Sequence, residues 1–302
     1  MTQVPMHAQQ KHQPFFKLMS RGTGKVVLKN KTLRWTTPPM FNDPFDVQTA
    51  LPLSHGETEG VRQAALDMLW ESFYENGPLE PESLIGKLVL RFRDKFPKME
   101  RSEFDSAYGP GFDEILSRPF ASEGAQAELG AFMARIKILC LTDRFDSVPM
   151  WSHYAEQHQG IALRFCTPEG FDSPWVMAKQ VHYSDQPPAF VEQEFLSAFL
   201  AGRYLPDKSQ LFDAMTYTKG SEWSYESEWR ISSGDGRNPN ATFEDLPFFA
   251  QEVDAIVLGC RMNEEDRAEF SALRNELFPH AELLMAVPRN DAYRMKLEPL
   301  AP

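Results

Sequence analysis

Two glutamates and an arginine recur at every second position near the end of residues 219–232, KGSEWSYESEWRIS. In a β-strand this spacing places Glu226, Glu228 and Arg230 on one face, because successive side chains point to opposite sides. The other face then carries Trp223, Tyr225, Ser227 and Trp229. Two neighbouring carboxylates in an enclosed site disfavour joint ionisation, so the pKa of one should rise. The pattern predicts an active-site platform, with a solvent-exposed polar face as the alternative.

A second candidate group lies in the segment WSHYAEQHQG. Helical spacing places four of its residues on one face: Trp151, Tyr154, Ala155 and His158. Two aromatic rings and a histidine can form the wall of a pocket that stacks a flat ring. Alternatively, both rings pack the helix onto a sheet and His158 caps it. Gly160 fits the left-handed residue that often ends a helix.

The proline-containing loop FNDPFD is the third candidate. Asn42, Asp43 and Pro44 are typical of an Asx turn, since short polar side chains bond the neighbouring backbone. The loop would also bring Asp43 and Asp46 within reach of a ligand at the end of a sheet. A purely structural turn is the alternative.

Several familiar motifs are missing from the chain. No GxSxG, HExxH, P-loop or GxGxxG sequence occurs, which argues against a nucleophile elbow and against dinucleotide binding of the Rossmann type. The cysteines, Cys140, Cys166 and Cys260, form no CxxC pair. We therefore expect neither a structural zinc site nor a disulfide framework.

Short apolar or alternating runs predict the strands. They cover residues 15–20, 31–37, 137–142, 160–165, 175–184, 219–232, 254–260 and 281–288, where the ordered series is expected to end. The segment RGTGK, between the first two of these strands, is expected to be a turn. Residues 38–46 must form a loop, because their prolines cannot join a ladder or a helix interior.

Helical periodicity dominates residues 57–105 and 188–218. Within the first range, Leu84, Leu88 and Phe92 form an expected buried stripe, and the opposite face is basic. Glycine and proline in 108–125 predict a surface connection. Two further helices are expected, at 148–158 and directly after Asn263, a suitable N-cap.

Strands at the start and in the second half, without regular βα alternation, predict an α+β fold with a mixed, mainly antiparallel sheet. We expect a single domain, 15–302, with a helical insertion at about 55–135, preceded by a disordered lead, 1–14. The chain has 31 basic and 43 acidic residues, a net charge of −12, which does not steer it to nucleic acid or anionic membranes. No run approaches the roughly 20 apolar residues of a membrane span. A cytoplasmic setting is expected.

The order of these segments resembles the bacterial domain-of-unknown-function family DUF2971. The shared pattern comprises the aromatic–lysine start FFK, FNDPF, W-x-x-Y-A-x-x-H-x-G, and a lysine and a tryptophan before E-x-E-x-R. The resemblance runs from about residue 15 to 262 and constrains 55–135 poorly. More distantly, the layout is similar to ADP-ribosyltransferase-like domains, in which Lys17, Thr36 or Thr37, and Glu228 would match the functional positions.

This second resemblance implies an NAD-consuming enzyme, with NAD as its substrate and with a role as a toxin or phage-defence effector. A carboxylate stabilises the oxocarbenium-like state formed when the nicotinamide–ribose bond breaks. Glu228 would serve this purpose, and Glu226 would activate a protein or nucleic-acid acceptor. The expected nucleotide-binding residues are Lys17, Thr36, Asn42, Asp43, Trp151, Tyr154, His158 and Arg230.

Two other functions remain open from the sequence. Asp43, Asp46, Glu226 and Glu228 could hold magnesium in a metal-dependent phosphoester hydrolase or nuclease. Alternatively, the chain is a non-catalytic binding or immunity module, and the basic residues of 87–98 face an acidic protein or RNA.

Overall fold

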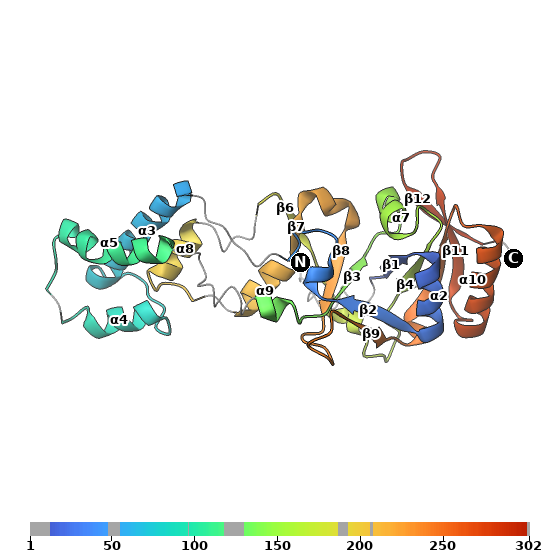
Figure 1. Cartoon of the computed structure of the whole chain (residues 1–302), viewed down its shortest axis with the longest axis horizontal. Coiled ribbons are helices and arrows are strands. Elements are labelled where there is room, and N and C mark those ends of the chain that lie inside the picture. Colours follow the sequence, from blue (N-terminus) through green and yellow to red (C-terminus); the bar gives the residue numbers. More distant parts are fainter. Residues whose placement is uncertain are drawn as a thin grey trace, which may run out of the picture. The chain divides into compact units, whose positions relative to one another are not determined.

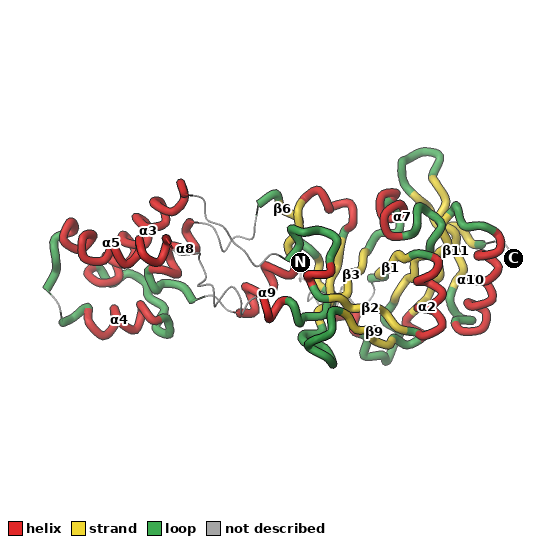
Figure 2. The backbone as a smooth tube through the Cα atoms, in the orientation of Figure 1, coloured by secondary structure: helices red, strands yellow, loops and turns green. Residues whose placement is uncertain are grey.

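The computed structural model describes residues 13–47, 55–95, 97–117, 130–186, 193–205 and 208–300. The chain divides into two compact units, which Figures 1 and 2 show with their elements. The sheet unit comprises Met1–Pro44, Ala134–Tyr183 and Lys219–Pro302. The helical unit comprises Phe45–Met133 and Ser184–Thr218. The expected lead of residues 1–14 lies outside the described residues except for its last two. The single-domain arrangement stays a prediction.

A ten-stranded sheet forms the centre of the sheet unit. Its main path runs β12 (Met295–Pro299), β11 (Glu282–Pro288), β10 (Val253–Gly259), β4 (Ile161–Phe165), β1 (Phe15–Met19), β3 (Ile138–Thr142), β2 (Thr32–Thr36) and β9 (Phe243–Pro247). The strand β8 (Glu228–Ser232) pairs with β3 and with β5 (Lys179–Gln180). Within this sheet β10 and β11 are parallel and the other pairings are antiparallel. The predicted α+β fold with a mixed, mainly antiparallel sheet is confirmed.

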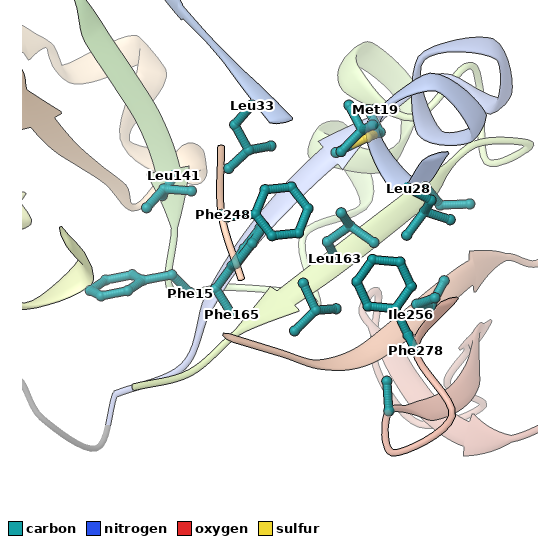
Figure 3. Close-up of a cluster of buried hydrophobic side chains, with 14 of the residues drawn as sticks. Phe15, Met19, Leu28, Leu33, Leu141, Leu163, Phe165, Phe248, Ile256 and Phe278 are labelled. Atoms are coloured by element: carbon teal, nitrogen blue, oxygen red, sulfur yellow. The ribbon is translucent and has the colours of Figure 1, made fainter. Parts of the chain in front are cut away.

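Alternation along the strands produces two apolar cores, one on each side of the sheet. The first core (Figure 3) packs the sheet against α2 (Arg21–Asn30) and α10 (Glu264–Leu277). The second core packs it against α7 (Val148–Tyr154). Full burial of each large apolar side chain stabilises the fold by roughly 1.5–3 kcal/mol. The two cores therefore fix which side chains of β3 and β8 face α7.

The segment RGTGK begins helix α2, so the expected turn was wrong. Ser20 caps the helix, because its hydroxyl accepts from the backbone N–H of Thr23 at 3.2 Å. Gly24 lies against Ile161, whose Cδ1 would stand 2.6 Å from an added Cβ. The glycine therefore serves close packing of α2 on the sheet. At α10 the predicted cap is confirmed, since Asn263 Oδ1 accepts from the Asp266 N–H at 2.8 Å.

Strands β9 and β12 were not predicted. Both lie at the ends of the main strand path, and both have largely exposed side chains. Edge strands need few apolar residues, so FEDLP and MKLEP lack an apolar run. The expected strand at 175–184 begins instead as a 3-10 turn, η2 (Pro174–Met177), followed by β5 and β6 (His182–Ser184). Strand β6 pairs with β7 (Thr218–Gly220) as a separate two-stranded sheet.

The helical unit contains five long described helices. They are α3 (His55–Tyr74), α4 (Leu84–Phe92), α5 (Arg101–Ser117), α8 (Gln193–Leu200) and α9 (Lys208–Thr216). Phe104 and Leu196 are among the residues of its own apolar core. The surface connection expected at 108–125 was wrong for residues 108–117, because α5 continues through Pro110 to Ser117. The expected stripe on α4 is also wrong: Leu84 and Leu88 are 74% and 42% exposed, and Val89 is buried. In the described parts of the chain, no helix has both the length and the apolar character needed to cross a membrane.

Candidate functional site

The acidic motif spans a 3-10 helix and a strand, which corrects the expectation of one continuous strand. Residues Ser221–Glu226 form the helix η4, Ser227 adopts a left-handed conformation (φ 45°), and β8 begins at Glu228. Glu226 therefore does not share a strand face with Glu228. Both carboxylates are nevertheless inside the protein, since the two residues are only 3% and 4% exposed. Burial of two acids so close together requires cationic partners.

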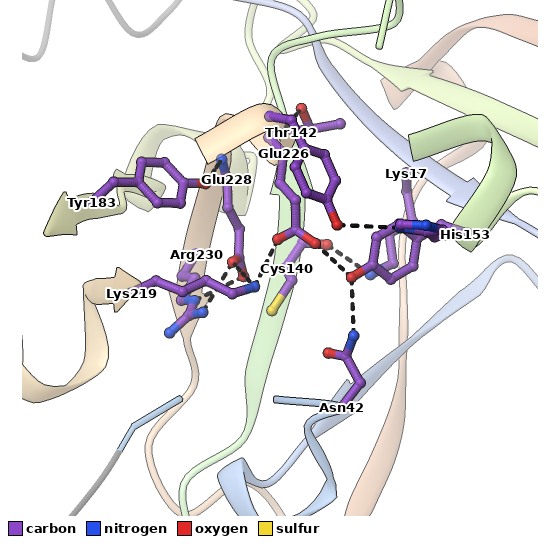
Figure 4. Close-up of polar contacts among 12 residues, drawn as sticks. Lys17, Asn42, Cys140, Thr142, His153, Tyr183, Lys219, Glu226, Glu228 and Arg230 are labelled. Atoms are coloured by element: carbon purple, nitrogen blue, oxygen red, sulfur yellow. Dashed lines mark hydrogen bonds and ion pairs between the residues drawn. The ribbon is translucent and has the colours of Figure 1, made fainter. Parts of the chain in front are cut away.

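Lys219 supplies one of these partners to both acids. Its Nζ donates to Glu226 Oε2 at 2.6 Å and to Glu228 Oε2 at 3.0 Å, and its side chain is buried (Figure 4). Lys219 was not among the site residues predicted from the sequence. The signal was present, because a lysine before E-x-E-x-R belongs to the motif pattern. The structure thus adds Lys219 to the candidate site.

Arg230 is the second cationic partner. It lies on the same face of β8 as Glu228, two residues along, and is completely buried. Its Nε donates to Glu228 Oε1 at 2.8 Å and its Nη2 to Glu228 Oε2 at 2.9 Å. Such a two-point contact between a guanidinium and a carboxylate is geometrically specific and strong. The predicted proximity of Glu228 and Arg230 is confirmed.

The electrostatic balance keeps Glu228 ionised. Burial by itself would raise the pKa of this carboxyl, but the charge and hydrogen bonds of Arg230, together with Lys219, hold its pKa at about 2. Cys140 lies opposite Arg230 in the β3–β8 register. Burial, and then the negative charge of Glu228, raise the pKa of the Cys140 thiol, so this cysteine stays protonated.

Glu226 has a different environment. Tyr154, the last residue of α7, donates its hydroxyl to Glu226 Oε1 at 2.5 Å. Asn42 in turn donates from Nδ2 to the same hydroxyl oxygen at 3.2 Å. Burial raises the pKa of Glu226, against the opposing effects of Lys219 and Tyr154. The pKa of Tyr154 is raised as well, by burial and by its bond to Glu226, so its phenol remains a neutral donor.

These contacts form a continuous chain of polar groups. It runs from the exposed Asn42 through Tyr154, Glu226, Lys219 and Glu228 to the fully buried Arg230 (Figure 4). The exposed end is the loop FNDPF, and the buried end is strand β8. Hydrogen bonds and ion pairs therefore connect the exposed loop with the acid pair.

Two further side chains hold the backbone on either side of Ser227. The Thr142 hydroxyl donates to the carbonyl of Glu226 at 2.5 Å. The N–H of Glu228 donates to the Tyr183 hydroxyl at 2.8 Å. Both acids are thus positioned through their main chain as well as through their carboxylates.

Lys17 and Thr36 lie on strands next to the site. The Lys17 ammonium donates to the Cys140 carbonyl at 2.7 Å, one strand away from Arg230. Thr36 is the last residue of β2, opposite Ile138 of β3 and Phe243 of β9. These contacts show both residues supporting β3, and their expected roles in nucleotide binding stay predictions.

The expected helix face of Trp151, Tyr154, Ala155 and His158 was wrong, because α7 ends at Tyr154. Trp151 is fully buried in the second core and donates from Nε1 to the Phe145 carbonyl at 2.7 Å. It therefore has no exposed surface for contact with a bound ring. Tyr154 alone of this group touches the acid pair.

His158 closes an unusual turn after α7. Glu156, Gln157 and His158 all have positive φ values, of 49°, 55° and 70°. The His158 Nε2 lies 3.1 Å from the Ser152 hydroxyl, and burial, followed by the charge of Arg261, lowers its pKa. The left-handed residues are therefore these three, and Gly160 was wrongly expected to be one. Gly160 is needed for another reason: an added Cβ would stand 2.2 Å from the Met19 carbonyl.

The metal-binding alternative lacks a ligand group. Asp43 is buried in the sheet unit, and Asp46 belongs to the helical unit. Within the described residues, no three histidine, cysteine or acidic side chains are grouped so that they could hold a metal ion.

Comparison with known proteins supports the resemblance seen in the motifs. The match to the family described as "Protein of unknown function (DUF2971)" covers the segment from α7 to β8, which contains Tyr154, Lys219, Glu226, Glu228 and Arg230. No curated protein and no solved structure matches the chain. The similarity to ADP-ribosyltransferase-like domains therefore remains one of sequence layout. Residues 150–231 of this chain match the DUF2971 family, as its motifs predicted.

Proposed function

We propose that this protein cleaves the N-glycosidic bond of NAD and passes the ADP-ribosyl group to water or to an acceptor. The observation that supports this proposal best is the buried acid pair, bridged by Lys219 and linked through Tyr154 to an exposed loop. A carboxylate held in a low-dielectric environment stabilises a developing cation far better than one in water. The bond to be broken generates such a cation on the ribose.

The chemistry balances without a further reagent. The electron pair of the C1′–N bond leaves with nicotinamide, whose ring nitrogen becomes neutral, and an oxocarbenium ion forms on the ribose. Water or an acceptor hydroxyl, amine or amide then bonds to C1′ and loses a proton. Glu226 suits the role of the base, because burial raises its pKa and a buried carboxylate with a raised pKa accepts protons more readily near neutral pH.

The two acids have different contacts, and we assign them different roles. Both oxygens of Glu228 accept bonds from Arg230, and Oε2 also accepts from Lys219. We therefore assign Glu228 a positioning role, through Lys219 and the backbone of β8. Both oxygens of Glu226 are bonded as well, to Tyr154 and to Lys219, but Tyr154 connects this carboxylate to the exposed loop. We therefore assign Glu226 the contact with the substrate, which would replace the Tyr154 hydroxyl at Oε1. The roles differ from the sequence-based expectation, in which Glu228 contacted the ribose.

The direct test is release of nicotinamide from NAD by the purified full-length chain, followed by chromatography. Glu226→Gln keeps the shape of the side chain and should lower the rate at least about 100-fold. Glu298→Gln, an exposed position on β12, is the matched control and should leave the rate unchanged. Wild-type protein that neither binds nor consumes NAD would refute the proposal.

The biological setting follows from such an activity. A chain that consumes NAD in the cytoplasm would stop growth of the cell that contains it, which is the action of a toxin or a phage-defence effector. The acceptor would be a protein or a nucleic acid, and water would serve in the simplest case. This role rests on the activity test above and on the growth assay described in the Discussion.

One observation favours a non-catalytic binding or immunity module as the second candidate. The two cations and two carboxylates of the site contact one another, so the cluster balances its own charge without a ligand. A cluster of this kind can simply specify how η4 and β8 pack. On this alternative, Glu228→Gln destabilises the protein, and neither wild type nor Glu226→Gln binds NAD in calorimetric titration.

A further inference from the structure

A row of aromatic rings lies on the α7 side of the acid pair. The rings of His153 and Tyr225 are 5.9 Å apart between centroids, and those of Tyr225 and Trp223 are 6.0 Å apart. His153 Nδ1 lies 3.2 Å from the Tyr225 hydroxyl, which ties α7 to η4. We call His153, Tyr225 and Trp223 the ring row.

The rings of the row reach the surface, unlike two tryptophans of the same unit. His153 is exposed, and Tyr225 and Trp223 are partly exposed. The neighbouring Trp151 is fully buried, and Trp229 is 8% exposed. Apolar rings left at the surface beside a polar cluster are a recurring feature of sites that hold a planar ligand.

Both ends of the ring row lead to Glu226. At one end, the Lys219 Nζ that bonds Glu226 lies 4.9 Å from the centroid of the Trp223 ring. At the other end, His153 contacts the ring of Tyr154, whose hydroxyl donates to Glu226. Trp223 and Glu226 are also three residues apart in a 3-10 helix, where such positions lie on the same side. The rings and the carboxylate are therefore parts of one local arrangement.

We propose that the ring row stacks the planar heteroaromatic base of a nucleotide, beside the ribose that Glu226 contacts. This inference rests on the proposed cleavage of NAD and adds to it the surface that orients the substrate. Stacking on aromatic side chains is a common way for proteins to hold bases, because every base has a flat face. Because Lys219 covers one face of Trp223, the ligand would use the opposite face together with the neighbouring Tyr225.

The two ends of NAD both carry a planar ring, so the experiment uses two probes. Adenosine monophosphate and nicotinamide mononucleotide are titrated separately into the full-length chain by calorimetry. We expect one of them to bind, which identifies the end that stacks, and Trp223→Ala and Tyr225→Ala each to weaken its binding about tenfold. Tyr225→Phe, which keeps the ring, should bind within about twofold of wild type.

The control is Tyr293→Ala, at a fully exposed ring outside the row, which should bind as wild type does. Thermal unfolding of each variant checks whether it is folded. If Trp223→Ala is not folded, the test relies on His153→Ala and Tyr225→Ala. Normal binding by the folded row variants would overturn the inference. The inference would also be overturned if wild type bound neither mononucleotide, or if it bound only a single-stranded oligonucleotide.

The outcomes separate this inference from the proposed function. If wild type releases nicotinamide from NAD and the folded row variants do so with an unchanged KM, the ring row is not the stacking surface and the function stands. If wild type binds a mononucleotide through the row yet never cleaves NAD, the binding surface stands and the proposed cleavage fails.

Discussion

Glu226 and Glu228 share a single ammonium group, with Lys219 Nζ 2.6 Å from the first carboxylate and 3.0 Å from the second. A chain segment that looks like one strand with a charged face thus becomes a helix and a strand folded around one lysine. The shared lysine makes the two acids one electrostatic unit, and several consequences can be measured.

Replacement of Lys219 should lower the free energy of unfolding much more than replacement of a similar lysine at the surface. Lys219→Met leaves two buried carboxylates without one of their cations, and we expect the free energy of unfolding to fall by about 3–5 kcal/mol. Lys25 is the matched control, because its Nζ also contacts two carboxylates, of Asp266 and Glu269, at 2.8 and 2.6 Å. Its side chain is 26% exposed, so Lys25→Met should cost about 1 kcal/mol or less. Urea unfolding of both variants gives the comparison, and equal losses would contradict it.

Acid should destabilise the protein through Glu228. The folded state holds the pKa of this carboxyl at about 2, below its usual 4.5, so its contribution to stability is present above pH 4.5. That contribution is lost as the pH falls from 4.5 towards about 2, and it amounts to roughly 3 kcal/mol at most. The pKa of Glu226 is raised, so its contribution to stability depends on pH in the opposite direction. That contribution is present below pH 4.5 and is lost as the pH rises through the pKa of Glu226 in the folded state.

Urea unfolding at a series of pH values checks this prediction. Wild-type stability should fall between pH 4.5 and 2 more steeply than that of Glu228→Gln, which cannot titrate at this position. Parallel pH dependence of the two proteins would show that Glu228 is not the residue responsible.

Removal of the Tyr154 hydroxyl should change the titration of Glu226. The tyrosine donates to the carboxylate and so lowers its pKa, although burial keeps that pKa raised overall. In Tyr154→Phe the pKa of Glu226 should therefore rise further. The acid limb of the pH–rate profile for nicotinamide release should move to higher pH, and carbon NMR of the glutamate carboxyls should show the same shift. Tyr293→Phe, at an exposed ring, should leave both unchanged.

Two glycines of the sheet unit should respond oppositely to alanine. A Cβ at Gly160 would stand 2.2 Å from the Met19 carbonyl, so Gly160→Ala must move the backbone between α7 and β4 and should cost roughly 1–3 kcal/mol or more. Gly22 lies in helix α2 with no atom within 4 Å of an added Cβ. Gly22→Ala should therefore stabilise the protein by roughly 0.5–1 kcal/mol. The melting temperatures of both variants test this prediction. If Gly160→Ala melted at the same temperature as wild type, the close approach at Gly160 would tolerate a methyl group.

Expression in a bacterial host tests the proposed biological role. Wild-type protein should slow growth and lower cellular NAD, and Glu226→Gln at the same expression level should restore both. The catalytic proposal attributes the effect to consumption of NAD, so growth arrest with unchanged NAD would point to another target.

Much of the sheet unit was predictable because its pattern is local. The apolar runs of β3, β4 and β10 and the cap at Asn263 depend on neighbouring residues, and the structure has them where the sequence placed them. Local patterns failed where packing overrides propensity. Helix α2 contains two glycines in its first turn and still forms, because Ser20 caps it and Gly24 packs against Ile161.

The residue types of the site were visible in the sequence, but their arrangement was not. Composition and spacing singled out Asn42, Tyr154, Glu226, Glu228 and Arg230 as candidates, and the motifs identified the family that residues 150–231 match. Tertiary structure decided that a lysine bridges the two acids and that Trp151 is core. The decisive contacts join residues 72 and 112 positions apart, between Tyr154 and Glu226 and between Asn42 and Tyr154. Such contacts exist only once the strands have paired and both sides of the sheet have packed, because no local periodicity encodes which distant side chains a buried charge will meet.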